Sequence, residues 1–196
     1  MLGTGRLAGP AAGKHSVPAW SLALPLAVVL VAALVAVAMV VMNQGSRTPW
    51  VAPGTAELGA SAPNFSSWDL NGAKVSLSDF KGKPVVLSFW ATSCTACQAE
   101  FPALQQVQDR HAAQGLTVLA VDYRETDTTR MASFLSGLHV AFRPVLDPQG
   151  TIAFAYGVDV GLPVNVWLDR SHTVRLVMVG EQKPADLAAA AAKVTA

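Results

Sequence analysis

The two cysteines of this 196-residue chain stand together, in Cys94-Thr95-Ala96-Cys97. An apolar run, Val85–Trp90, precedes them, and a helical pattern continues directly after them from Gln98. This pattern predicts a strand that delivers two thiols to the first turn of a helix. Free N–H groups and the macrodipole at such a helix end stabilise a thiolate, which is the form of cysteine that attacks disulfides. The second thiol lies one helical turn on, close enough to form or resolve a disulfide, so we expect redox chemistry at this pair.

A zinc site and a purely structural disulfide are the alternatives for the cysteine pair. Zinc would need two further ligands, and the four histidines are too scattered to supply them at the usual spacing: His15, His111, His139 and His172. A structural disulfide stays open, although a bridge across so few residues closes a tiny loop and constrains the unfolded chain little. We therefore expect a redox-active Cys94–Cys97 disulfide, no metal and no separate cofactor.

Residues 19–42 form a long apolar run. No charged residue occurs between Ser16 and Ser46. A helix over residues 19–42 is long enough to cross the roughly 30 Å hydrocarbon core of a membrane. A cleavable signal peptide is the alternative, but its apolar core is typically only about 7–15 residues long, and no clear cleavage site follows closely. The run therefore predicts a transmembrane signal-anchor that contacts the lipid bilayer.

The charges around this run predict its orientation. Arg6 and Lys14 precede it, whereas all 13 acidic residues follow it, the first being Glu57. The positive-inside rule then leaves residues 1–18 as a cytoplasmic arm and puts the bulk of the chain outside. A formal net charge of +1 gives no indication of nucleic-acid binding. We expect a monomeric, single-pass protein of a bacterial cell membrane, whose thiols meet disulfide-bearing exported proteins where disulfides persist.

Two regions follow the predicted anchor. Residues 43–61 are rich in Gly, Pro, Ser, Thr and Ala without a sustained period, which predicts a flexible tether. Residues 62–196 are long enough for one domain with its own core. Strand–helix–strand patterns follow a hairpin signal at Asn71-Gly72, so we predict an α/β fold with a mixed central sheet flanked by helices. The expected strands are 65–70, 74–77, 85–90, 116–123, 144–146, 164–168 and 174–179, and the expected helices are 94–114, 128–138 and 184–194.

Several short segments in this domain occur in a characteristic order. They are Ala62–Phe65, Val75–Lys83, Phe89–Cys97, Glu100–Leu104, Leu119–Val121, Tyr156–Val158 and Gly161–Pro163. In sequence and spacing they resemble the membrane-anchored thioredoxin-like proteins of the TlpA, ResA and CcmG type, over roughly residues 62–182. The resemblance implies a thioredoxin-like fold with an N-terminal β-hairpin extension. It also implies thiol–disulfide exchange outside the cytoplasmic membrane, often as a reductant in cytochrome c maturation.

The resemblance assigns roles to the cysteines by position. Cys94 matches the exposed nucleophile, whose thiolate attacks a substrate disulfide, and Cys97 matches the residue that resolves the mixed disulfide. Glu125 matches an acid that some members place beside the cysteines, which makes it a candidate catalytic proton acceptor. An ordinary exposed loop glutamate is the equal alternative at this position.

The expected substrate-binding residues also come from the resemblance. Pro163 matches a proline that follows a cis peptide bond and faces the disulfide, an arrangement that leaves a backbone edge free for a substrate chain. Leu162 and Trp90 complete this set, although the surroundings expected for Trp90 favour packing over chemistry. The chain departs from the family pattern at Ser93, where many relatives have Trp, and it has Ser88 where thioredoxin buries an Asp.

Further departures concern the residues that tune redox potential and substrate choice. Thr95-Ala96 replaces the usual Gly-Pro or similar dipeptide, and Val164-Asn165 stands where Thr-Thr is common. We expect a reductant of disulfides in exported proteins that is recharged by a membrane thiol carrier. Three alternatives stay open: a disulfide donor to secreted proteins, a peroxiredoxin-like antioxidant, and a redox-inert binding module.

Overall fold

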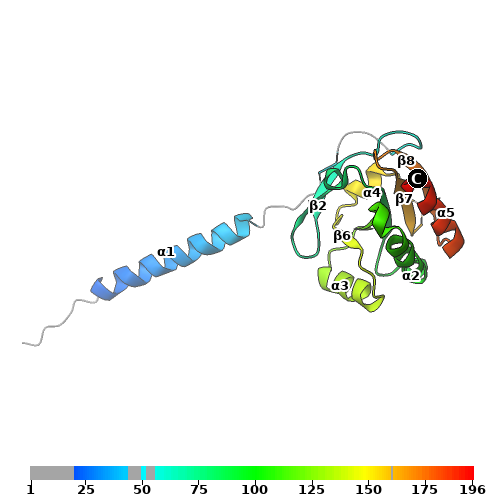
Figure 1. The fold of residues 1–196 in the computed structure, drawn as a ribbon. Coiled ribbons are helices and arrows are strands. Elements are labelled where there is room, and N and C mark those ends of the chain that lie inside the picture. Colours follow the sequence, from blue (N-terminus) through cyan, green and yellow to red (C-terminus); the bar gives the residue numbers. More distant parts are fainter. Residues whose placement is uncertain (1–19, 44–49, 52–55, 160) are drawn as a thin grey trace, which may run out of the picture. The chain divides into compact units, whose positions relative to one another are not determined.

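The computed structural model of the chain describes residues 20–43, 50–51, 56–159 and 161–196 (Figure 1). The chain divides into two units, and the first contains one described helix, α1 (Trp20–Asn43). Side chains in α1 are described for residues 28–39. Within the described part of the chain, no helix is both long and apolar enough to cross a membrane. The span over 19–42 therefore stays a prediction, and the cytoplasmic arm, residues 1–18, lies outside the described residues.

The second unit is built on a five-stranded mixed sheet with the strand order β6-β5-β4-β7-β8. Its central strand, β4 (Val85–Trp90), runs parallel to β5 (Thr117–Asp122) and antiparallel to β7 (Val164–Leu168). The edges are β6 (Arg143–Val145) and β8 (Val174–Val179). Every residue of β4 is buried, because the strand has neighbours on both sides and is covered on both faces. The predicted α/β fold with a mixed central sheet is confirmed.

Helices cover both faces of this sheet. The long helices α2 (Thr95–Arg110) and α5 (Pro184–Thr195) pack on one face together with α3 (Thr128–Gly137), around a core that includes Trp90 and Phe101. The short helix α4 (Thr151–Ala155) and the N-terminal hairpin bury the opposite face, around Phe65, Leu87 and Phe89. Alternate residues of β4 therefore enter different cores. The cysteines lie on the sheet face that α2 covers.

The hairpin signal at Asn71-Gly72 is confirmed. β2 (Phe65–Trp68) pairs antiparallel with β3 (Lys74–Ser76). Between them the Asp69 carboxylate accepts the N–H groups of Asn71 and Ala73, each at 2.9 Å. A 3-10 turn, η1 (Leu77–Phe80), then leads toward β4.

The predicted tether over 43–61 is wrong in part. Residues 50–51 form β1 (Trp50–Val51), which pairs with β2 as the third strand of a small sheet. Ala56 donates its N–H to the carbonyl of Ala155, and Gly59 donates to the carbonyl of Val174. Sequence composition did not show these bonds, because their partners lie far along the chain. The remaining tether positions, 44–49 and 52–55, lie outside the described residues.

Two helices differ from expectation. The helix expected to reach residue 114 ends at Arg110, and a 3-10 turn, η2 (Ala112–Gln114), follows before Gly115 adopts a left-handed φ of 82°. No pattern in the sequence predicted α4, since five residues are too few to show a helical period. The Asp147 carboxylate starts α4 by accepting the N–H groups of Ile152 and Ala153.

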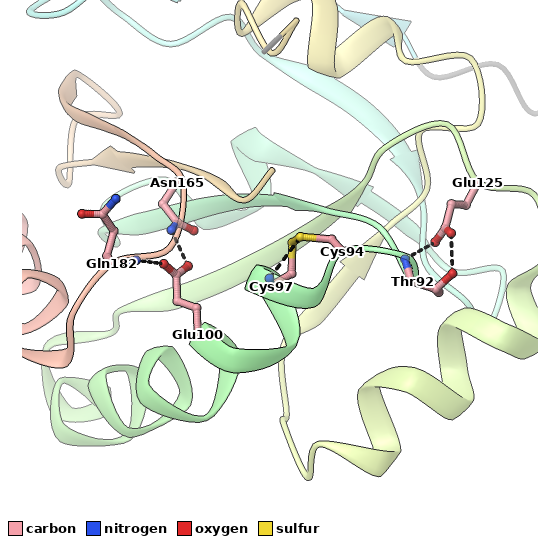
Figure 2. Close-up of a disulfide and its surroundings, with 7 residues drawn as sticks. All are labelled: Thr92, Cys94, Cys97, Glu100, Glu125, Asn165 and Gln182. Atoms are coloured by element: carbon pink, nitrogen blue, oxygen red, sulfur yellow. Dashed lines mark hydrogen bonds between the residues drawn. A yellow bond between two sulfur atoms is a disulfide. The ribbon is translucent and has the colours of Figure 1, made fainter. Parts of the chain in front are cut away.

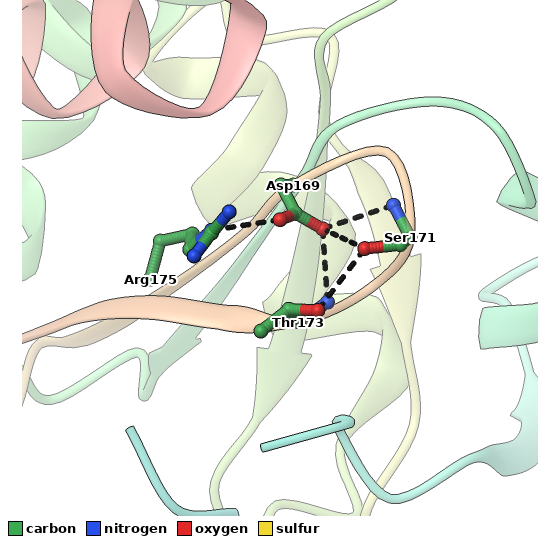
Figure 3. A network of polar contacts seen from close by, with 4 residues as sticks. All are labelled: Asp169, Ser171, Thr173 and Arg175. Atoms are coloured by element: carbon green, nitrogen blue, oxygen red, sulfur yellow. Dashed lines mark hydrogen bonds and ion pairs between the residues drawn. The ribbon is translucent and has the colours of Figure 1, made fainter. Parts of the chain in front are cut away.

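The turn between β7 and β8 is closed by Asp169 (Figure 3). One carboxylate oxygen accepts the N–H and hydroxyl of Ser171 and the N–H of Thr173, and the other accepts Nε of Arg175 at 2.7 Å. Partial burial raises the pKa of Asp169, but these hydrogen bonds outweigh it and hold the pKa below its ordinary value. The turn fixes the predicted antiparallel pair, and with it the start of β7 that follows Pro163.

Candidate active site

The two cysteines lie at the carboxyl end of β4, where the chain turns into α2. Cys94 is the N-cap of α2, and its Sγ accepts the N–H of Cys97 at 3.0 Å (Figure 2). The two residues form a disulfide, with their Cα atoms 5.3 Å apart. Cys94 is half-buried, whereas Cys97 is completely buried. Of the two cysteines, Cys94 is therefore the one that an incoming molecule can meet.

The position of Cys94 favours its thiolate. The first turn of the 16-residue helix α2 presents unpaired N–H groups and the positive end of the helix dipole to this sulfur. The bond from the N–H of Cys97 is one of these contacts. After reduction, the same contacts stabilise negative charge on Cys94, which makes it the better nucleophile and the better leaving group of the pair.

Glu100 is the acid nearest to Cys97 along the buried face of α2, and no role was predicted for it from the sequence. It is 1% exposed, and it lies one turn beyond Cys97 on that face. Its Oε1 accepts Nδ2 of Asn165 at 2.6 Å, and its Oε2 accepts the N–H of Gln182 at 2.7 Å. Burial raises the pKa of Glu100, and the two hydrogen bonds offset this only in part. Glu100 is therefore a buried carboxyl on the same helix face as Cys97, and each of its oxygens accepts a hydrogen bond.

A sequence signal for Glu100 did exist. Cys97, Glu100, Phe101 and Leu104 follow the spacing of one helix face, and the other three are apolar core residues. A glutamate on such a stripe is seldom buried without a partner. Its partners could not be read from the sequence, because they come from β7 and from the loop before α5.

Asn165, a departure from the family pattern, lies beside a second buried polar group. Asn165 on β7 pairs with Ser88 on β4, so both lie on the sheet face that α2 covers. Both side chains are fully buried, and Ser88 Oγ and Asn165 Oδ1 make no hydrogen bond among the described residues. The oxygen of the Asn165 amide is thus free to accept a hydrogen bond if the amide rotates.

Glu125 lies on the other side of the disulfide in the view of Figure 2. Its Oε2 accepts the N–H of Thr92 at 3.0 Å, and its Oε1 accepts the Thr92 hydroxyl at 2.6 Å. The carboxylate therefore holds both the backbone and the side chain of Thr92, two residues before Cys94. These contacts indicate that Glu125 holds the loop before Cys94 in place. Proton transfer by Glu125 stays a prediction.

The three residues expected to bind substrate fall in different surroundings. The Leu162–Pro163 peptide bond is cis, as the family resemblance implied, and Leu162 is half-buried. Leu162 also lines a cavity of about 100 Å³ with Tyr123, Val158, Asp159 and Gly161. Trp90 is 1% exposed and stacks on Phe134 with ring centroids 5.0 Å apart. These contacts support a packing role for Trp90. A contact between Trp90 and substrate stays a prediction.

The chain is similar to known proteins. Residues 58–177 match the model of the AhpC/TSA family. The thiol-disulfide oxidoreductase ResA of Bacillus thuringiensis subsp. konkukian is 35% identical over 139 residues, which cover 71% of this chain and 79% of that protein. The chain belongs to the thioredoxin-like thiol–disulfide oxidoreductases of the TlpA, ResA and CcmG type. This family membership makes it an enzyme of thiol–disulfide exchange.

Solved structures of related proteins agree with this family. A Chlorobium tepidum protein assigned as a thiol:disulfide interchange protein DsbE superposes with a TM-score of 0.66 at 33% identity, covering 72% of this chain and all of that one. A secreted disulfide oxidoreductase of Mycobacterium tuberculosis, homologous to DsbE of E. coli, gives a TM-score of 0.59 at 28% identity and covers 66% of this chain and 95% of its own. The thioredoxin-like fold of the family is therefore confirmed for the second unit.

Three buried carboxyls give this family member an expected pH dependence of stability. Burial raises the pKa values of Glu100 and Asp147, and it raises the pKa of Asp122 from 3.8 to about 7. Each group binds its proton more tightly in the folded than in the unfolded chain, so the free energy of unfolding falls as pH rises through this window. The shift of Asp122 alone corresponds to roughly 4 kcal/mol. Urea unfolding should therefore give a higher free energy at pH 5.5 than at pH 8, and a lower value at pH 5.5 would contradict this account.

Proposed function

We propose that this protein reduces disulfides in exported proteins through the Cys94–Cys97 dithiol. The observation that carries the proposal is the contrast in burial within the pair: Cys94 is half-exposed at the N-terminus of α2, and Cys97, in its first turn, is completely buried. One thiol can therefore meet a substrate, while the other is held in reserve one turn away. Membership of the ResA and DsbE-type family supports the same reaction.

The proposed reaction proceeds in two exchanges. The Cys94 thiolate attacks one sulfur of the substrate disulfide, a mixed disulfide forms, and the first substrate thiolate leaves. Cys97 then gives its proton to the Glu100 carboxylate, and its thiolate attacks the sulfur of Cys94. The second substrate thiolate leaves and is protonated from solvent. The substrate gains two electrons, and the Cys94–Cys97 disulfide is formed.

We also propose that the protein works outside a bacterial cell membrane, anchored through residues 19–42 with residues 1–18 in the cytoplasm. The apolar run and the distribution of charges support this arrangement. All the described side chains of α1, residues 28–39, are apolar, which suits this helix to lipid. A membrane thiol carrier would return electrons to the pair. Apocytochrome c, before haem attachment, is the candidate substrate that the family resemblance suggests.

The reduction potential of the pair tests the direction of electron flow. The full-length protein in detergent would be equilibrated with glutathione or dithiothreitol buffers and its free thiols counted. A reductant is expected to give a potential below about −220 mV, because the disulfide donors protein disulfide isomerase and DsbA lie at about −180 and −120 mV. A potential above about −180 mV would make the protein a disulfide donor. Rapid consumption of hydrogen peroxide with oxidation of Cys94 to a sulfenic acid would instead favour a peroxidase, an activity raised by the AhpC/TSA match.

A further inference from the structure

Asp122 is a buried carboxylate whose two oxygens are both used by backbone N–H groups. It ends β5, directly beside Trp90 at the end of β4, and is 1% exposed. Its Oδ1 accepts the N–H of Asp147 at 2.6 Å, and its Oδ2 accepts the N–H of Glu125 at 3.0 Å. This carboxylate therefore joins the loop after β6 to the loop after β5, near the carboxyl end of β4, which leads to the cysteines.

The bond to Glu125 continues toward the cysteines. Asp122 fixes the backbone of Glu125, and the Glu125 carboxylate in turn accepts the N–H and hydroxyl of Thr92. The carbonyl of Ala91, next to Thr92, accepts the N–H of Cys94 at 3.0 Å. A continuous set of hydrogen bonds thus runs from Asp122 to the segment that presents Cys94 at the start of α2.

Asp122 is surrounded by other charged groups in these loops. The Asp147 carboxylate is occupied by the N–H groups of α4, and Glu125 by Thr92. Arg124, in a left-handed conformation with φ of 59°, donates its N–H to the carbonyl of Asp147, and its charge favours ionised Asp147. Burial is the main cause that raises the pKa of Asp122 to about 7; the charges of Asp147 and Glu125 add to it, and the two N–H bonds oppose it.

We propose that Asp122 is a positioning residue, which sets the reactivity of Cys94 by holding Glu125 against Thr92, and that protonation of Asp122 loosens this hold. The inference rests on the proposed role of Cys94 as the attacking thiol. An ionised carboxylate accepts both N–H groups, whereas a protonated one carries a donor on one oxygen and loses acceptor capacity there. The loop before Cys94 is then held less firmly at the N-terminus of α2, and the N–H groups there stabilise the Cys94 thiolate less.

Alkylation of Cys94 across a pH series tests this role. The full-length chain carrying Cys97→Ser leaves one thiol, and its rate of reaction with iodoacetamide would be measured from pH 5 to 9, with and without Asp122→Asn. The parent profile is expected to show a second step near pH 7 besides the ionisation of Cys94. Asp122→Asn should remove that step and slow alkylation about five- to tenfold at pH 7, with little difference at pH 9, where the thiol is ionised in both.

Asp147→Asn is the matched control, because it removes a buried carboxylate of the same network that holds α4 and does not touch Glu125. Its alkylation profile should keep the second step and the rate at pH 9, with the step moved to a lower pH because the charge of Asp147 no longer raises the pKa of Asp122, even if the variant is less stable. Thr92→Val combined with Asp122→Asn should slow alkylation little more than either change alone, since both act on one connection. Profiles that superimpose with and without Asp122→Asn, or an equal change with Asp147→Asn, would overturn the proposal.

A measurement on the unaltered protein covers the case in which Asp122→Asn does not fold. The amide resonance of Thr92 should shift with pH at the same midpoint as the Asp122 carboxyl carbon; if Thr92 does not follow Asp122, the proposal fails. Neither experiment uses a disulfide substrate. A protein that proves to be a disulfide donor could therefore still show this coupling, and failure of the coupling would leave the proposed reductase activity standing.

Discussion

Replacing Cys94 with Ser is expected to lower the rate of disulfide reduction by at least about three orders of magnitude. The chain has two cysteines, and the other, Cys97, is completely buried in the first turn of α2. A serine hydroxyl at the helix end is not ionised at neutral pH, so the N–H groups there have no thiolate to stabilise. Turnover of a disulfide-bearing protein such as insulin, with dithiothreitol as electron source, measures the loss.

Cys97→Ser is the matched variant, and it should fail in a different way. Cys94 keeps its exposure and its helix end, so the first exchange proceeds, and the mixed disulfide then persists because no second thiol resolves it. Non-reducing gels and mass spectrometry should show a substrate chain bound to Cys94. If Cys94→Ser trapped substrate instead, or if Cys97→Ser turned over normally, the assignment of the two cysteines would be reversed or wrong.

The parts of the site with strong local signals could be predicted from sequence. The apolar run Val85–Trp90 became β4 with the same bounds, and the helix begins after Cys94, because a strand followed by an N-cap is encoded within a few residues. The terminal strand pair was also correct in its bounds, since a polar turn separates two apolar runs. The cis bond before Pro163 came from the family resemblance, and no local pattern would have shown it.

The parts of the site that could not be predicted from the sequence depend on contacts between residues far apart in the chain. Glu125 and Thr92 are 33 positions apart, and Glu100 meets Asn165 and Gln182 across 65 and 82 positions. Propensity and periodicity describe neighbours along the chain, so they place Glu100 on a buried face without showing what satisfies it there. The resemblance directed attention to Glu125, whose carboxylate holds the loop before the cysteines. The acid on the same face of α2 as Cys97 is Glu100, and this was seen only in the structure.

Glu100→Gln is expected to slow resolution of the mixed disulfide by about a hundredfold or more, which is the usual contribution of a positioned proton acceptor. A glutamine amide cannot take the proton of Cys97, so the thiolate needed for the second exchange would form only by loss of the proton to water. The initial attack by Cys94 should change little. Stopped-flow measurement with a disulfide peptide would separate the two exchanges, and mixed disulfide should accumulate transiently in the variant.

This substitution also distinguishes chemistry from structure, because the site can hold a glutamine. The Gln182 N–H can still bond to the amide oxygen, and rotation of Asn165 turns its unpartnered Oδ1 toward the new amide group. Removing a buried group whose ionisation is disfavoured should leave the thermal midpoint at pH 8 unchanged or raised. A stable variant with slow resolution supports proton transfer by Glu100. A stable variant that resolves at the wild-type rate would show that Glu100 only joins α2 to β7 and the loop before α5.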